Sequence, residues 1–181
     1  MTNEVDAVLH FWLEETPPEQ RFKQSDALDA EIERRFGALN RRLADGVGDE
    51  WRQSPRATLA AVIVLDQFSR NLHRGSPAAY AQDEAARDLS RAAIAKGWHV
   101  GMDSFERQFL FMPFMHSEEI ADQRWSMALF AEAGNDLAYD FARRHYEQIE
   151  RFGRFPQRNV VLGRESTAEE VAFLETPGAA F

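Results

Sequence analysis

The sequence of 181 residues contains no cysteine. This absence excludes a disulfide framework, a cysteine nucleophile, a thiolate zinc site and a cysteine-ligated iron–sulfur cluster. Long apolar runs are also missing. The longest, Leu59 to Leu65, has seven residues, whereas a transmembrane helix needs about 20. We therefore expect a protein that folds around its own core and does not span a membrane.

Positive charge is scarce as well. The formal net charge is −9, and binding to nucleic acid or to an anionic membrane needs clustered Lys and Arg. We therefore expect no nucleic-acid partner and no membrane partner. The opening residues, MTNEVDAVLHFWLEE, lack the basic start and the apolar stretch of a signal peptide. Together with the lack of cysteine, this favours a cytoplasmic protein.

Recognised catalytic signatures are absent. The sequence has no Gly-rich phosphate loop, no nucleophile elbow and no His-Glu-x-x-His motif. No motif indicates a cofactor. We also expect no tightly bound transition metal, because the five histidines lack the spacing of metal ligands. They are His10, His73, His99, His116 and His145.

Apolar residues recur at helical spacing along almost the whole chain, and a Gly or Pro follows most of these segments. The pattern predicts one all-α domain over residues 1–181, with about seven to eight helices joined by short connections. Short connections favour antiparallel neighbours. We expect Pro113 to break or kink the chain. The predicted buried residues are Leu59, Val62, Ile63, Phe68, Phe109, Leu129 and Ile149.

Three motifs concentrate polar residues near the ends of helices. The first is LDQFSRN, residues 65–71, at the end of the most apolar helix. Asp66 and Arg70 are four residues apart and can pair on one helix face. One interpretation is an internal salt bridge with Asn71 as a helix C-cap, and the other is a supporting role beside a ligand.

The second motif is HSEEIADQ, residues 116–123. His116 precedes a helix, and Glu118 or Glu119 is close enough in sequence to form a general acid/base pair with it. The alternative is a helix cap with a hydrogen-bonded histidine. A di-iron site is disfavoured because such helices carry Glu-x-x-His, whereas this motif reads His-x-x-Glu.

The third motif is an arginine-rich loop, residues 151–164, which contains four Arg and no acidic residue. Arginine favours bidentate pairing with carboxylate or phosphate. The predicted helix start at Ser166 and Thr167 also favours an anion. The alternative is that the arginines pair with acidic residues of the chain. The candidate ligand-binding residues of the loop are Arg154, Arg158, Asn159 and Arg164.

The motifs LDQFSRN, HSEEIADQ and RFGRFPQRNVVLGRESTAEE together closely resemble the bacterial domain-of-unknown-function family 924, from about Val8 to the C-terminus. The resemblance implies a helical fold similar to the tetratricopeptide-like superfamily. It implies no established activity, so no functional residue is carried over. This chain has Ser69 where the family typically has Pro, and Gln157 where it typically has His.

These observations lead to one hypothesis and one alternative. The hypothesis is a pocket at which the three motifs meet and bind a small anionic molecule, with at least two of the loop arginines close to another motif. His116 with Glu118 or Glu119 would supply any acid/base chemistry, and Asp66, Arg70 and Asn71 would support the site. The alternative is a non-enzymatic helical scaffold that binds a peptide or protein. The sequence defines neither a reaction nor an oligomeric state.

Overall fold

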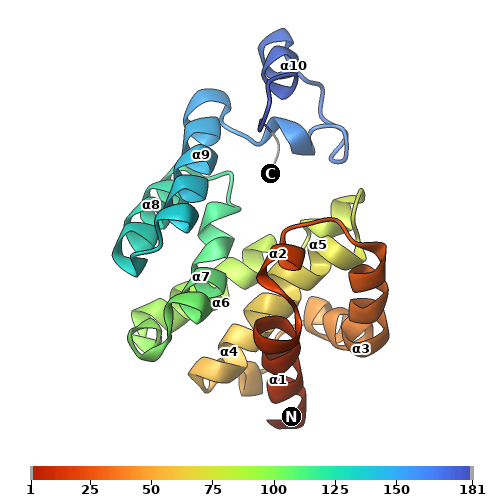
Figure 1. Ribbon diagram of the computed structural model, residues 1–181, viewed down its shortest axis with the longest axis vertical. Helices are drawn as coiled ribbons and strands as arrows, with labels where there is room; N and C mark the ends of the chain where they lie inside the picture. Colours follow the sequence, from red (N-terminus) through yellow and green to blue (C-terminus); the bar gives the residue numbers. More distant parts are fainter. Residues whose placement is uncertain (1, 180–181) are drawn as a thin grey trace. The chain divides into compact units, whose positions relative to one another are not determined.

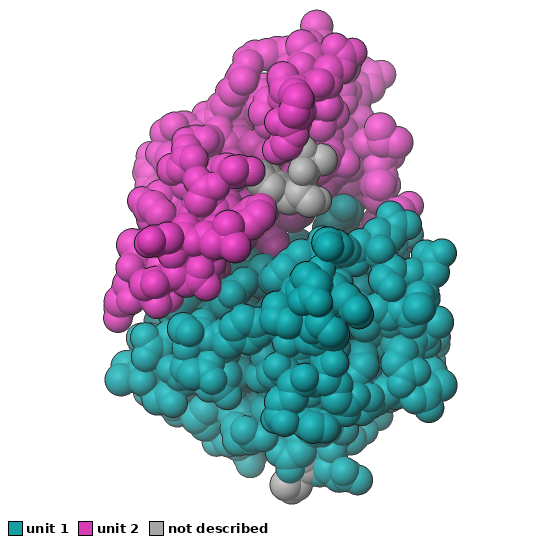
Figure 2. Space-filling view, in the orientation of Figure 1, with its two compact units in different colours: residues 1–74, 78–113 teal, residues 75–77, 114–181 magenta. Residues whose placement is uncertain are grey.

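The structure is a computed structural model that describes residues 2–179. The chain folds into two compact units, which Figure 2 shows in two colours. Unit 1 comprises Met1–Arg74 and Ala78–Pro113, and unit 2 comprises Gly75–Pro77 and Phe114–Phe181. Helices account for the regular structure of both, and no strand occurs within residues 2–179. The predicted all-α fold is therefore confirmed.

Unit 1 holds the first helices of Figure 1. The symbol η marks a short 3₁₀ or π-helical segment. The last two residues of helix α7, Phe114 and Met115, belong to unit 2. The segments are α1 (Thr2–Leu9), η1 (His10–Glu15), α2 (Pro18–Arg21), α3 (Asp26–Asp45), η2 (Asp49–Arg52), α4 (Pro55–Val62), η3 (Ile63–Phe68), α5 (Ser69–Leu72), η4 (Pro77–Ala79), α6 (Asp83–Ala95), η5 (Trp98–Gly101) and α7 (Ser104–Met115).

Helix α7 does not break at Pro113, although a break was one of the two outcomes that we expected. It continues through this proline to Met115. A proline in a helix interior costs about 3 kcal/mol, but every residue from Phe109 to Met115 other than Pro113 is a buried apolar side chain. The helix begins after Asp103, whose Oδ1 accepts hydrogen bonds from the backbone N–H groups of Phe105 and Glu106. Burial of the last turn offsets the strain of the proline.

The core of unit 1 is mainly aliphatic but contains an aromatic cluster at two π-helical segments, η1 and η3. Phe68 of η3 meets Phe11 and Trp12 of η1 edge to face, with ring centroids 6.0 and 5.3 Å apart. All three side chains are buried. Edge-to-face packing adds to the stabilisation from buried area. The predicted burial of Leu59, Val62, Ile63, Phe68 and Phe109 is confirmed.

The π-helical hydrogen-bond pattern of η3 is accompanied by a side-chain bond from another helix. Asn40 of α3 is buried, and its Nδ2 donates to the Val64 carbonyl at 3.0 Å and to Ser69 Oγ at 2.9 Å. A buried carbonyl without a donor is costly. Asn40 therefore supports the helix turn from which the LDQFSRN side chains project.

Unit 2 contains α8 (Ile120–Ala133), α9 (Asp136–Phe152), η6 (Pro156–Arg158) and α10 (Ala168–Leu174). Helices α8 and α9 lie side by side (Figure 1). They are joined by Gly134 in the left-handed conformation and by Asn135, whose side chain accepts from the backbone N–H of Ala138. Such a short connection makes them antiparallel. Leu129 and Ile149 are buried, as predicted.

Within residues 2–179, no helix combines the length and the apolar character that crossing a lipid bilayer requires.

Candidate functional site

The HSEEIADQ motif forms the start of α8. Ser117 Oγ donates to Asp122 Oδ2 at 2.9 Å and accepts from the backbone N–H of Glu119. Gln123 is fully buried, and its Nε2 donates to the carbonyls of Met115 and Ser117 at 2.7 and 2.6 Å. Glu119 occupies the N-cap position of α8, and its exposed side chain makes no cap hydrogen bond. Much of the motif therefore positions the helix start.

Glu118 of this motif binds the arginine-rich loop. Its two carboxylate oxygens accept from Arg164 Nη1 and Nη2 at 2.7 and 2.9 Å, and Oε1 also accepts from the backbone N–H of Phe155 at 2.8 Å. Burial alone would raise the pKa of Glu118, but the bonds from Arg164 and Phe155 hold it below its ordinary value. Glu118 is thus ionised at neutral pH and is an anchor for the loop, which makes it a poor general acid.

Arg154 pairs with an acidic residue farther along the chain. Its Nε and Nη2 donate to the two carboxylate oxygens of Glu170 at 2.6 and 2.8 Å. Glu170 also accepts from the backbone N–H of Thr167, which completes a capping box at the start of α10. The hydrogen bond from Arg154 is the largest cause that lowers the pKa of Glu170 to about 2. The anion at the start of α10 is therefore the chain's own Glu170.

Asn159 joins these two ion pairs. It is fully buried, its Oδ1 accepts from Arg164 Nε at 3.0 Å, and its Nδ2 donates to Ser166 Oγ at 3.1 Å and to Glu170 at 3.3 Å. Its side chain therefore connects the Arg164–Glu118 pair with the Arg154–Glu170 pair.

Arg158 takes part in a different arrangement, centred on the buried ring of Phe155. Its guanidinium lies over this ring at 4.6 Å, and its Nη2 donates to the His116 carbonyl at 2.9 Å. The ring of His145 meets Phe155 at 5.5 Å, and the rings of His116 and His145 are 6.1 Å apart. We call His116, His145, Phe155 and Arg158 the Phe155 cluster. The structure thus brings Arg158, like Arg164, to the HSEEIADQ motif.

His145 of this cluster has a defined orientation. It is buried, and its Nδ1 lies 2.7 Å from the Phe141 carbonyl. A carbonyl oxygen only accepts, so Nδ1 carries a proton and donates it to Phe141. The position of His145 beside Phe155 had no signal in the sequence, because helical spacing does not show which loop covers a helix.

The LDQFSRN motif lies in unit 1. Asp66 is fully buried, and Arg70 Nη1 lies 3.0 Å from Asp66 Oδ1 and 2.9 Å from Asp83 Oδ1. Burial disfavours the charge of Arg70, yet Asp66 and Asp83 raise its pKa above the ordinary value. The predicted Asp66–Arg70 pairing is therefore present. Asp83, which joins it from the start of α6, was not among our candidates.

Asn71 does not cap α5, since the C-cap position is His73. Its Nδ2 donates to Asp29 Oδ1 of α3 at 2.7 Å instead. The first motif belongs to unit 1 and the other two belong to unit 2. The meeting of all three at one pocket stays a prediction.

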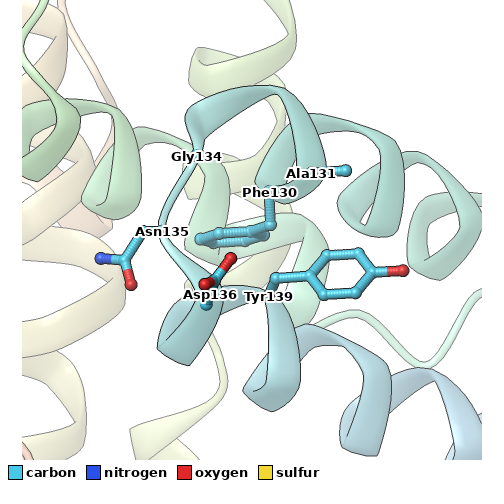
Figure 3. Close-up of a pocket in the computed structure, with 6 residues that line it drawn as sticks. All are labelled: Phe130, Ala131, Gly134, Asn135, Asp136 and Tyr139. Atoms are coloured by element: carbon cyan, nitrogen blue, oxygen red, sulfur yellow. The ribbon is translucent and has the colours of Figure 1, made fainter.

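Two surface hollows occur in unit 2. The hollow in Figure 3 has a volume of about 230 Å³ and lies at the turn between α8 and α9. The Asp136 carboxylate lies beside the Phe130 ring there. The second hollow, of about 370 Å³, is lined by α9, the end of α10 and the segment that follows it. None of the predicted site residues lines either one. The candidate site residues are therefore identified by their side-chain contacts and not by a surface hollow.

Metal binding finds no support in the geometry. Across the described range, no three His, Asp or Glu side chains gather in a way that could hold a metal ion. The expected lack of a metal stays a prediction, which elemental analysis of the purified protein tests.

Comparison with known proteins places the chain among relatives of undetermined function. No curated protein matches the sequence. Among solved structures, the chain is similar to the protein of unknown function ATU0120 from Agrobacterium tumefaciens, with 34% identity and a TM-score of 0.88. The similarity covers 96% of this chain and 98% of that one. Residues 8–178, which include all three motifs, match the family described as bacterial protein of unknown function DUF924. The chain therefore belongs to the DUF924 family.

Proposed function

We propose that this protein binds a small anionic molecule at the Phe155 cluster. The observation that supports the proposal is that the Arg158 guanidinium and the His145 ring both contact the buried Phe155 ring, while the His116 ring lies 6.1 Å from that of His145. His116 precedes α8, His145 belongs to α9 and Arg158 belongs to η6, so three separate segments contribute. A guanidinium and imidazole N–H groups are the donors that oxyanions prefer.

Two neighbouring ion pairs fix the position of the loop that contains Phe155 and Arg158. The Glu118–Arg164 pair holds the loop at the start of α8, and the Glu170–Arg154 pair holds it at the start of α10. Phe155 lies beneath the guanidinium of Arg158 and restricts its plane. A site whose donors are held in place before binding loses less entropy when the ligand arrives. In this proposal Arg154 and Arg164 position the loop, and Arg158 contacts the ligand.

Acid/base chemistry is not part of the proposal. The expected partner of His116 was Glu118 or Glu119. Glu118 is occupied by Arg164 and by the Phe155 backbone, and Glu119 is exposed. The proposed activity is therefore binding alone.

Thermal unfolding with added sulfate tests the proposal. A ligand that binds only the folded state raises Tm. Arg158→Gln should remove this specific increase. Arg151→Gln should retain it, because Arg151 forms an exposed pair with Glu169. The general stabilisation by sulfate acts on all variants equally. An identical response of wild type and Arg158→Gln would refute the proposal.

The scaffold alternative rests on a different observation. Helix α10 exposes Val171 and Leu174, 48% and 36% respectively, three residues apart and hence on one face. A tetratricopeptide-like scaffold would use such a face for a peptide. Val171→Ser should then abolish peptide capture and leave the sulfate response unchanged, which separates the two functions.

A further inference from the structure

A buried arginine in unit 1 lacks an acidic partner. Arg21 ends α2 and is 6% exposed. Its Nε donates to the Trp12 carbonyl at 2.6 Å, and its Nη2 donates to the Leu13 carbonyl at 2.9 Å. Its Nη1 is buried and has no hydrogen-bond partner within residues 2–179. Burial lowers the pKa of Arg21, and the nearby charge of Glu19 only partly opposes this. One donor of a desolvated cation is thus unused.

A second unused donor lies in the same part of the core. The indole Nε1 of Trp12 is buried and has no acceptor among the described residues. An indole nitrogen can only donate. The Trp12 ring meets Phe109 at 6.0 Å, and Phe109 meets Phe105 at 5.8 Å. The guanidinium of Arg21 lies over that Phe105 ring at 4.6 Å. Trp12 therefore borders Phe109 and Arg21 borders Phe105, and these two phenylalanines are in contact with each other.

The arrangement contrasts with that of Arg70 in unit 1, whose side chain is 20% exposed. Arg70 faces two carboxylates, Asp66 and Asp83, as a buried charge normally does. The chain has 30 acidic and 21 basic side chains, so a carboxylate would be easy to supply. Two buried donors without an acceptor, one of them on a cation, are suited to the two oxygens of a carboxylate from outside the chain.

The side chains around the two donors indicate which kind of chemical group is attached to that carboxylate. Phe105, Phe109 and Trp12 provide aromatic surface, and Phe22 stacks on Phe109 at 6.4 Å with an interplanar angle of 10° while its own side chain is 57% exposed. Phe22 is thus the solvent-facing member of this group, and displacement of its ring opens a way in. A single cation near the negative Glu19 suits a singly charged ligand better than a phosphate dianion.

We propose that Trp12 and Arg21 form a binding site, separate from the Phe155 cluster, for a monocarboxylate with an aromatic body. One carboxylate oxygen accepts from Arg21 Nη1 and the other from Trp12 Nε1, while the aromatic body packs on Phe105 and Phe109. The proposal does not depend on anion binding by Arg158.

Titration of protein that carries ¹⁵N-labelled tryptophan with benzoate tests this site. The four tryptophans produce four indole N–H signals, and Trp12→Phe identifies the signal of Trp12. We expect a saturable shift of this signal with benzoate. Benzamide has the same shape without the charge and should bind at least about tenfold more weakly, a factor that corresponds to about 1.4 kcal/mol. Inorganic phosphate should leave the signal unchanged.

Two variants provide the controls. Arg21→Lys keeps the positive charge but loses the planar fork, so the Kd for benzoate should rise about tenfold. Arg158→Gln should leave the benzoate titration unchanged. The proposal is overturned if the Trp12 signal does not shift up to about 10 mM benzoate, where a millimolar Kd is nearly saturated. It is also overturned if benzamide binds equally well. Both outcomes come from the wild-type protein, so an Arg21 variant that fails to fold leaves the test intact.

Discussion

Glu118 and Arg164 form a bidentate ion pair across 46 residues of sequence, with both guanidinium Nη atoms within 3 Å of the carboxylate. The same carboxylate accepts the backbone N–H of Phe155. One side chain thus fixes both the path of the arginine-rich loop and the position of the ring at the centre of the Phe155 cluster.

We expect Glu118→Gln and Arg164→Gln each to lower the free energy of unfolding by roughly 1–3 kcal/mol, because each leaves a half-buried charge with fewer partners. The double variant should lose clearly less than the sum of the two. Urea unfolding of all four proteins measures this coupling. Additive losses would show that the pair contributes no net interaction.

The exposed pair of Asp6 and Arg56 is the matched control, because it has a similar length of 2.9 Å but both side chains are more than half exposed. Its coupling in the same double-mutant cycle should stay below about 0.5 kcal/mol, as solvent screens it.

The triad of Asp66, Arg70 and Asp83, in which Asp66 is fully buried and the other two are partly buried, predicts a larger loss of stability. Asp66→Ala should lower the free energy of unfolding by roughly 3–5 kcal/mol, because the partly buried Arg70 loses one of its two carboxylates. Asp66→Asn retains the shape and should lose about half as much. Chemical denaturation measures both. If Asp66→Asn lost no stability while Asp66→Ala lost the full amount, the effect would belong to side-chain volume and a role for the charge would be contradicted.

The lowered pKa of Glu170 predicts how the free energy of unfolding changes at acidic pH. Its folded pKa of about 2 lies below the ordinary 4.5, so the stabilisation is fully present above pH 4.5 and is lost as the pH falls toward 2. The amount is on the order of 2 kcal/mol, allowing for the partial exposure of Arg154. Glu170→Gln should flatten the fall in stability in this window, whereas Glu169→Gln at the exposed neighbour should not. Unfolding free energies measured at several acidic pH values test this.

The support of η3 by Asn40 is also testable. Asn40→Ala should lower the free energy of unfolding by roughly 2 kcal/mol, because it leaves the buried Val64 carbonyl without its side-chain donor and creates a small cavity. Ser69→Ala removes the other acceptor of Asn40 but keeps the bond to Val64, so it should lose about half as much. Thermal or urea unfolding compares the two. A Ser69→Ala loss as large as that of Asn40→Ala would contradict the assigned role of the carbonyl bond.

The sequence by itself determined the all-α class, the core residues and several helix caps. These properties depend on local patterns: apolar side chains three and four residues apart, and a Ser, Thr or Asn that reaches a backbone N–H three residues ahead. Thr167, at the helix start that the sequence predicted, acts in this way, and Ser25, Ser54 and Asn135 make the same kind of bond. The Asp66–Arg70 pair was predictable for the same reason, since both residues lie on one turn of one helix.

Only the tertiary structure decided which acidic residue each arginine meets. With 30 acidic side chains in the chain, spacing cannot select Glu118 for Arg164 or Glu170 for Arg154, because these pairs form only after separate helices pack. Arg21 is the clearest case. The polar segment PEQRFK resembles an exposed turn, yet packing of α2 against η1 and α7 buries the guanidinium between two carbonyls and a phenylalanine ring. Burial of a charge is a property of the assembled core, and no local pattern encodes it.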